Sequence, residues 1–199
     1  MLMILLSLLE PDATFVDCGA NVGAWSANVA SMARILPGIK VIAFEPHPDT
    51  FARLVKTMAS YPDAECHNFA LSDRRRQLRL SEGAGSQTFG VARSHFQIER
   101  ETRMVEARPL DEFLGGRQRI FITIDVEGHE YEVLRGARRT LSSGRVRAVL
   151  IDGCDREYRD AIVAEMSQLG FDLRSLHTLR PLGAEDRILA LGSRESRAE

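Results

Sequence analysis

The residues best suited to chemistry lie in a short glycine-containing stretch near the start of the chain, DCGANVG at 17–23. An apolar run ends there and a helix-like segment begins, so we expect a strand, a tight turn and a helix N-terminus that together bind a nucleotide-like ligand. NAD-binding proteins use a similar unit with the motif G-x-G-x-x-G. Here Asn21 takes the place of the middle glycine, and Asp17 would repel a pyrophosphate. The stretch therefore disfavours NAD.

A ligand with a cationic end reverses that electrostatic sign. S-adenosylmethionine carries an ammonium and a sulfonium group, so Asp17 would attract it, directly or through water. Glu45 ends the next predicted strand, where a carboxylate can accept both ribose hydroxyls. Glu45 predicts an adenosine ligand without choosing between the two cofactors. The structural alternatives are a helix N-cap or a strand-end turn residue for Asp17, and a surface carboxylate before Pro46 for Glu45.

A second group of candidates lies in the segment DVEGHE at 125–130. Asp125, Glu127 and His129 alternate, so in an extended chain they would share a face. With Asp152 on the neighbouring strand, three carboxylates and an imidazole could gather at the carboxyl edge of the sheet. They could supply a general base, Asp125 or His129, or ligands for a divalent cation. The third alternative is helix capping by Glu127 with a solvated His129; we expect the base and no metal.

Alternating strands and helices must position these residues. Strand-like runs are expected at Ala13–Cys18, Lys40–Phe44, Glu65–Leu71, Ile120–Val126 and Val146–Ile151, and two more, Phe171–Leu176 and Arg187–Gly192, close the chain. Helical spacing is seen at 22–36, after Pro46, at Tyr131–Leu141 and at Ala161–Leu169. This α/β pattern predicts a mostly parallel sheet with helices on both faces. Residues 72–114 instead suggest a hairpin and loop insertion between the third and fourth strands, with Gly83–His95 as a lid over the acceptor.

The composition is that of one globular domain over residues 1–199. The chain is 44% hydrophobic and 27% charged, which excludes disorder, a coiled coil and a collagen-like repeat. A net charge of −2 gives no reason to expect nucleic acid or a membrane as partner. The apolar start is too short for a membrane span and lacks signal-peptide features, so we predict an N-terminal helix within 1–12 and a frayed tail at 193–199. Three scattered cysteines indicate a reducing, cytoplasmic location.

Five segments occur in a characteristic order and spacing: DCGANVGAWS, FEPHPDTFARL, NFALSD, RPLDEFL and ITIDVEGHEYEVLRGA. Together they resemble the FkbM family of S-adenosylmethionine-dependent methyltransferases over roughly residues 12–152. The resemblance implies a class I methyltransferase (Rossmann-like) fold with a seven-stranded sheet whose last strand is antiparallel. It also implies methyl transfer to a hydroxyl oxygen.

The resemblance assigns roles by position. Residues expected to bind the cofactor are Asp17, Gly19, Ala20, Asn21 and Gly23 around its methionine part, Glu45 on the ribose, Ala70 and Leu71 near the adenine, and Asp125. Asp125, Glu127 and His129 are the catalytic candidates. The sequence departs from the family pattern at Thr123, where a lysine is usual, and at Asp152, where a glutamate is frequent.

The function predicted from these residues is S-adenosylmethionine-dependent O-methylation of a small molecule or glycoside by direct displacement. A protein of the same fold that binds the cofactor without catalysis is the first alternative, because only residues 1–12 precede the first strand and family members often carry more sequence there. An NAD-dependent oxidoreductase is the second.

Overall fold

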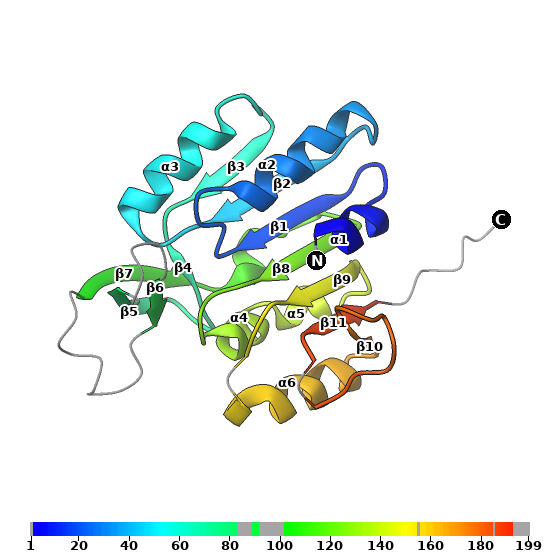
Figure 1. Ribbon diagram of the computed structural model, residues 1–199. Helices are drawn as coiled ribbons and strands as arrows, with labels where there is room; N and C mark the ends of the chain where they lie inside the picture. Colours follow the sequence, from blue (N-terminus) through cyan, green and yellow to red (C-terminus); the bar gives the residue numbers. More distant parts are fainter. Residues whose placement is uncertain (1, 83–88, 92–101, 155, 185, 193–199) are drawn as a thin grey trace.

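A seven-stranded sheet covered by helices on both faces forms the body of the computed structural model, which describes residues 2–82, 89–91, 102–154, 156–184 and 186–192 (Figure 1). Its strands are β1 (Thr14–Cys18), β2 (Lys40–Phe44), β3 (Ala64–His67), β8 (Ile120–Ile124), β9 (Val146–Ile151), β10 (Asp172–Ser175) and β11 (Ile188–Leu191). They lie in the order β10-β11-β9-β8-β1-β2-β3, and β11 is antiparallel to both of its neighbours. The predicted fold, including the antiparallel last strand, is confirmed.

Two sets of helices cover the two faces of this sheet. The first face packs against α1 (Leu2–Leu8), α2 (Ala24–Ser31) and α3 (Pro48–Met58), and the second against α4 (Glu130–Gly136), α5 (Arg138–Leu141) and α6 (Arg156–Gln168). The described residues also contain the 3-10 helices η1 (Met32–Arg34), after α2, and η3 (Leu110–Glu112), before β8. None of the helices in the described ranges is long and apolar enough to cross a membrane.

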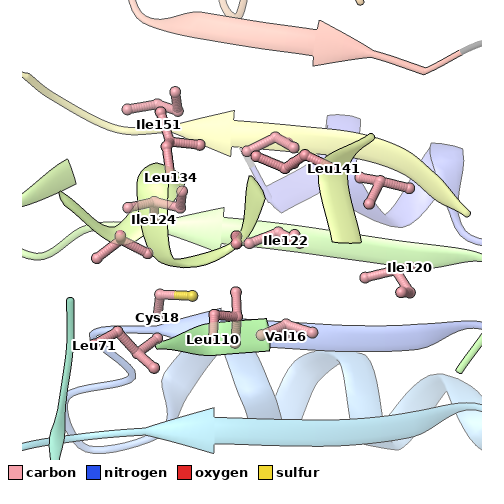
Figure 2. Packing of buried hydrophobic residues seen from close by; sticks show 14 of the residues in the cluster. Val16, Cys18, Leu71, Leu110, Ile120, Ile122, Ile124, Leu134, Leu141 and Ile151 are labelled. Atoms are coloured by element: carbon pink, nitrogen blue, oxygen red, sulfur yellow. The ribbon is translucent and has the colours of Figure 1, made fainter. Parts of the chain in front are cut away.

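The central strands of the sheet are mostly apolar because helices cover both of its faces. In β8, Ile120, Ile122 and Ile124 pack on the α4–α6 side, and Figure 2 shows them beside Leu134 and Leu141. The intervening residues of β8 face the α1–α3 side instead. Burial of each large apolar side chain contributes about 1.5–3 kcal/mol, so these continuous runs hold the sheet rigid beneath the site.

Two helices are shorter than the sequence pattern suggested. The helix expected over 22–36 starts only at Ala24, because Gly23 has a φ of 86° and cannot be part of it. The helix expected over 131–141 is broken at Ala137 into α4 and α5. Gly136 ends α4 directly against the backbone of Ser72, where a Cβ would collide with the Ser72 carbonyl oxygen.

The expected third strand, Glu65–Leu71, is wrong as a single element. β3 ends at His67, and Ala70–Leu71 forms β4 of a separate sheet, parallel to β7. The Asn68 side-chain amide between them donates to the carbonyl oxygens of Glu45 (2.9 Å) and Pro46 (3.1 Å). These hydrogen bonds hold Asn68 against the residues that follow β2. The chain then leaves the main sheet and enters the second sheet at β4.

The second sheet confirms a hairpin insertion between the third and fourth strands of the main sheet. It consists of β4 (Ala70–Leu71), β5 (Arg76–Glu82), β6 (Phe89–Val91) and β7 (Thr102–Arg108), in the order β4-β7-β5-β6. Most of the loop predicted as a lid, residues 83–88 and 92–95, lies outside the described residues, as does the tail at 193–199.

Candidate functional site

A cavity of about 320 Å³ opens at the carboxyl ends of β1, β2 and β8, where the strand order of the sheet reverses. Open α/β sheets bind ligands at such a point. The cavity is lined by Gly19, Asn21, Phe44, Glu45, Pro46, Thr50, Phe69, Ala70, Leu71, Leu80, Asp125, Val126, Glu127 and His129. Both groups of candidates from the sequence therefore meet in one place.

The turn after β1 has left-handed backbone conformations at Gly19 (φ 87°), Asn21 (φ 50°) and Gly23 (φ 86°). Asparagine tolerates this conformation better than most residues, and glycine adopts it without strain. At Gly19 a Cβ would also collide with the backbone carbonyl oxygen of Asp125. Gly19 and Asn21 line the cavity, whereas Ala20 and Gly23 do not: Ala20 lies in the core and Gly23 packs against Leu54.

Glu45 is buried in the cavity wall rather than exposed, with 6% of its surface accessible. Its Oε1 accepts a hydrogen bond from the His47 backbone N–H (2.8 Å) and its Oε2 one from the Asn21 backbone N–H (3.0 Å). Burial raises the pKa of Glu45 to about 7, against the lowering effect of these two bonds. The side chain thus ties the end of β2 to the turn after β1.

Asp17 is not among the described residues that line the cavity. Its carboxylate is 4% exposed; Oδ2 accepts from Ser26 Oγ (2.6 Å) and Oδ1 from Thr123 Oγ1 (3.1 Å). The Ser26 backbone N–H donates to it as well, which agrees with the helix-capping alternative. Burial raises the pKa of Asp17, partly offset by these hydrogen bonds. Its charge acts on the cavity from behind, since it also raises the pKa of Glu45 and of Asp125.

The loop after β8 is bent, so its candidates do not share one extended face as expected. Glu127 has a φ of 52° and Gly128 a φ of 97°, which turns the chain between Asp125 and His129. Asp125 and Glu127 are solvent-exposed at the cavity, while the His129 side chain is buried. All three catalytic candidates nevertheless line the cavity.

Asp125 is surrounded by other carboxylates. Partial burial raises its pKa to about 6, and the charges of Asp152, Glu127 and Asp17 add to this rise, while Arg187 lowers the pKa. Asp152 is itself ion-paired with Arg187. Among the residues that the structure describes, no group of His, Cys, Asp and Glu is arranged to hold a metal ion.

Two residues of the insertion, Ser72 and Arg76, contact the His129 side chain. His129 Nε2 lies 3.0 Å from Ser72 Oγ and 3.4 Å from Arg76 Nη2, and His129 Nδ1 lies 3.4 Å from a carboxylate oxygen of Glu132. Arg76 also donates to Ser72 Oγ through Nε (3.1 Å) and Nη2 (2.8 Å). A solvated His129 is therefore wrong, and of the two candidate bases Asp125 is the solvent-exposed one.

Sequence reasoning missed the apolar wall of the cavity. Phe44 and Phe69 line it, with ring centroids 5.6 Å apart, and His67 stacks on Phe44 at 5.1 Å. The available signal was the position of Phe44 directly before Glu45 at the end of a strand. Pro46, Thr50, Leu80 and Val126 were missed too. An aromatic wall beside a carboxylate suits a flat apolar ring joined to a polyol.

The matching family model and two similar proteins are named for one activity, methyl transfer. The family model described as "Methyltransferase FkbM domain" matches residues 17–173. The chain is 28% identical over 159 residues to 2-O-methyltransferase NoeI of Sinorhizobium fredii, covering 71% of this chain and 64% of that protein. It is 27% identical over 144 residues to hexuronic acid methyltransferase AglP of Haloferax volcanii, covering 72% and 57%. The chain thus spans less than two thirds of the length of these relatives.

A third relative is much longer. AMB antimetabolite synthetase AmbE of Pseudomonas aeruginosa is 27% identical over 221 residues, an alignment that covers 92% of this chain and 10% of that protein.

Solved structures support the fold. A methyltransferase FkbM from Methylobacillus flagellatus superposes with a TM-score of 0.57 at 20% identity, over 93% of this chain and 45% of that one. Precorrin-6y C5,15-methyltransferase from Geobacter metallireducens superposes with a TM-score of 0.51 at 12% identity, over 96% and 87%. At these identities the likeness concerns the fold alone.

Proposed function

The chain belongs to the methyltransferase FkbM domain family, and from this premise we propose that it transfers a methyl group from S-adenosylmethionine to a hydroxyl oxygen of a small molecule or glycoside. The observation that carries the proposal is the charge of the cavity wall. Among the described lining residues, Glu45, Asp125 and Glu127 are acidic and none is lysine or arginine. Such a wall favours a sulfonium cation and disfavours a pyrophosphate.

The residues present fit the adenosine part of this cofactor. Each carboxylate oxygen of Glu45 accepts one backbone N–H and keeps a second lone pair for a ribose hydroxyl. Phe44, Phe69 and Leu71 supply an apolar surface for the adenine ring. Because Gly19 has no side chain, the turn after β1 packs closely on the backbone of Asp125, and both residues line the part of the cavity where the reacting end of the cofactor would lie.

When bound, the cofactor supplies an electrophilic methyl group on sulfur. The chain has to hold the acceptor oxygen in line with it and remove one proton. Asp125 suits the second task, because it is exposed to the cavity and its pKa of about 6 leaves it charged at neutral pH yet more basic than an ordinary aspartate. Holding the oxygen at near-attack distance supplies much of the remaining rate enhancement.

The acceptor class rests on the relatives. NoeI is named as a 2-O-methyltransferase and AglP as a hexuronic acid methyltransferase, which makes a sugar hydroxyl the first acceptor to test. We propose no nucleic-acid or membrane partner. The second candidate, a protein that binds the cofactor without catalysis, predicts binding but no transfer.

Two measurements test the proposal. Isothermal titration calorimetry with S-adenosylmethionine, S-adenosylhomocysteine and NAD should show binding of the first two only; binding of NAD alone would overturn it. Transfer of a labelled methyl group is then measured on a panel of glycosides and uronic acids. Binding without transfer to any acceptor would favour the non-catalytic alternative.

A matched pair of variants locates the site. Glu45→Ala should abolish cofactor binding, because Glu45 both shapes the turn and accepts the ribose. Glu106→Ala, on the exposed face of β7, should leave it unchanged. Equal affinity of wild type and Glu45→Ala would place the ribose elsewhere.

A further inference from the structure

The antiparallel last strand brings a cation to the carboxyl edge of the sheet. In the register of β9 and β11, Ile188 pairs with Ile151, the last residue of β9. The residue before β11, Arg187, therefore lies beside the residue after β9, Asp152. Arg187 Nη1 is 2.6 Å from Asp152 Oδ1.

Asp152 in turn is fixed next to the candidate base. The Asp152 backbone N–H donates to the Ile124 carbonyl oxygen (3.1 Å), and the Asp125 backbone N–H donates to the Cys18 carbonyl oxygen (3.0 Å). The ends of β1, β8 and β9 are thus aligned by backbone hydrogen bonds. Arg187, Asp152 and Asp125 follow one another across this edge.

Asp125 is influenced by three negative charges and one positive charge. Asp152 at the end of β9, Glu127 in its own loop and Asp17 in β1 each raise the pKa of Asp125, and Arg187 lowers it. Within the described residues, these are the charged groups that act on Asp125. Arg187 is 47% and Asp152 21% exposed, so solvent screens the pair and moderates its effect.

We propose that Arg187 is a positioning residue of the methyl-transfer site: its ion pair with Asp152 offsets the negative charge around Asp125 and keeps that carboxylate charged. The inference rests on the proposed function only where Asp125 removes the proton of the acceptor. The charge coupling itself does not depend on any substrate.

Carbon-13 NMR of aspartate-labelled protein tests the coupling directly, because it follows the carboxyl titration of Asp125 without acceptor or cofactor. Arg187→Gln should move the titration to higher pH, since an attractive charge is lost and Asp152 is left uncompensated. Asp152→Asn should move it to lower pH, since a repelling charge is lost. The double variant should return close to wild type, and Arg187→Lys should stay near it.

A matched control comes from the same C-terminal hairpin. Arg174 forms an ion pair with Asp172 (2.8 Å) on β10, away from the cavity, so Arg174→Gln should leave the titration of Asp125 in place. An unchanged titration in both Arg187→Gln and Asp152→Asn would overturn the inference. So would equal shifts in Arg174→Gln and Arg187→Gln, because they would show a general effect of surface charge.

The pH profile of turnover separates this inference from the proposed function. In Arg187→Gln the acidic limb should shift upward, with about a threefold loss of kcat at pH 6, little loss at pH 8 and an unchanged KM for the cofactor. Arg187→Lys should restore the profile. A profile that ignores Arg187 in an active enzyme would sink the inference alone, whereas NMR shifts in a protein with no transferase activity would sink the proposed function alone.

Discussion

Two aspartates at the carboxyl ends of neighbouring parallel strands have opposite surroundings. Asp17 in β1 is enclosed beneath α2, with hydroxyl groups of Ser26 and Thr123 on its two oxygens. Asp125, directly after β8, is open to the cavity and surrounded by further carboxylates. Burial raises the pKa of both, but Asp17 holds the turn in place while Asp125 is available to a ligand. The position of a carboxylate at the end of a strand therefore does not determine its role. What matters is whether the side chain is covered by a helix, as for Asp17, or exposed at the cavity, as for Asp125.

The largest expected effect on stability and binding is at Gly19, where the turn after β1 contacts the backbone of Asp125. Gly19→Val places a β-branched side chain at a φ of 87° and against the Asp125 carbonyl oxygen. We expect a loss of about 3 kcal/mol or more in the free energy of unfolding, and no detectable cofactor binding. Urea denaturation and calorimetric titration measure the two effects. Gly115→Ala, with nothing within 4 Å of the new Cβ, is the control. Wild-type affinity in Gly19→Val would show that the turn is not the cofactor site.

The next effect separates chemistry from binding. Asp125→Asn removes the proton acceptor with little change in shape, so turnover should fall by about 10²–10⁴-fold while cofactor affinity changes little. Wild-type turnover should rise with pH through a pKa of about 6 and lose this dependence in the variant. Initial rates of labelled methyl transfer provide both readouts, with the exposed Asp172→Asn as control. Equal rates in wild type and Asp125→Asn would assign the proton to another group.

A third prediction concerns the contribution of Glu45 to the pH dependence of stability. The pKa of Glu45 is raised in the folded protein from 4.5 to about 7, so the folded state binds the proton more tightly than the unfolded state does. Stability from this group is therefore present below pH 4.5 and falls as the pH rises to 7, by about 3 kcal/mol. Glu45→Gln should remove this slope, whatever its effect on absolute stability. Parallel unfolding curves for the two proteins from pH 5 to 8 would contradict the burial of an ionisable Glu45.

The smallest effect tests the enclosure of Asp17. Ser26→Ala leaves a buried carboxylate without one hydroxyl donor and should cost about 1–2 kcal/mol of unfolding free energy. Ser31→Ala removes an exposed hydroxyl that bonds to a backbone carbonyl in the same helix, and should cost less than about 0.5 kcal/mol. Thermal and urea unfolding of both variants measure the difference. Equal costs would mean that Ser26 does not support Asp17 in solution.

Local patterns were sufficient for the elements and for the backbone of the turn. Apolar runs predicted Lys40–Phe44 and Val146–Ile151 with their observed bounds, because strands covered on both faces are mostly apolar; the charged exceptions are Lys40 and Arg147. Gly19, Asn21 and Glu45 were placed at the cavity because turn geometry and strand ends depend on residues close in sequence.

Contacts between distant segments were beyond the same reasoning. The end of β3 depends on Asn68 reaching the carbonyl oxygens at the end of β2. The state of His129 depends on Ser72, 57 residues earlier in the chain. The partners of Asp17 depend on how α2 lies over the sheet, which no spacing along β1 records. Side-chain pairings of this kind follow from packing, so the sequence pattern could not predict which groups hold the candidate residues in place.

The short strand β4 pairs with β7 at the base of the insertion, and this pairing has a consequence for how the length of the insertion can vary. Ala70 and Leu71 pair with Ala107 and Arg108, and the Ser72 backbone N–H donates to the Arg108 carbonyl oxygen (3.0 Å). The insertion thus begins and ends at the same place, where β4 pairs with β7. Because the entropy of closing a loop grows only slowly with its length, we expect a longer or shorter insertion to cost little stability. Exchange of the whole segment should still alter the site, because Arg76 contacts His129 and Leu80 lines the cavity.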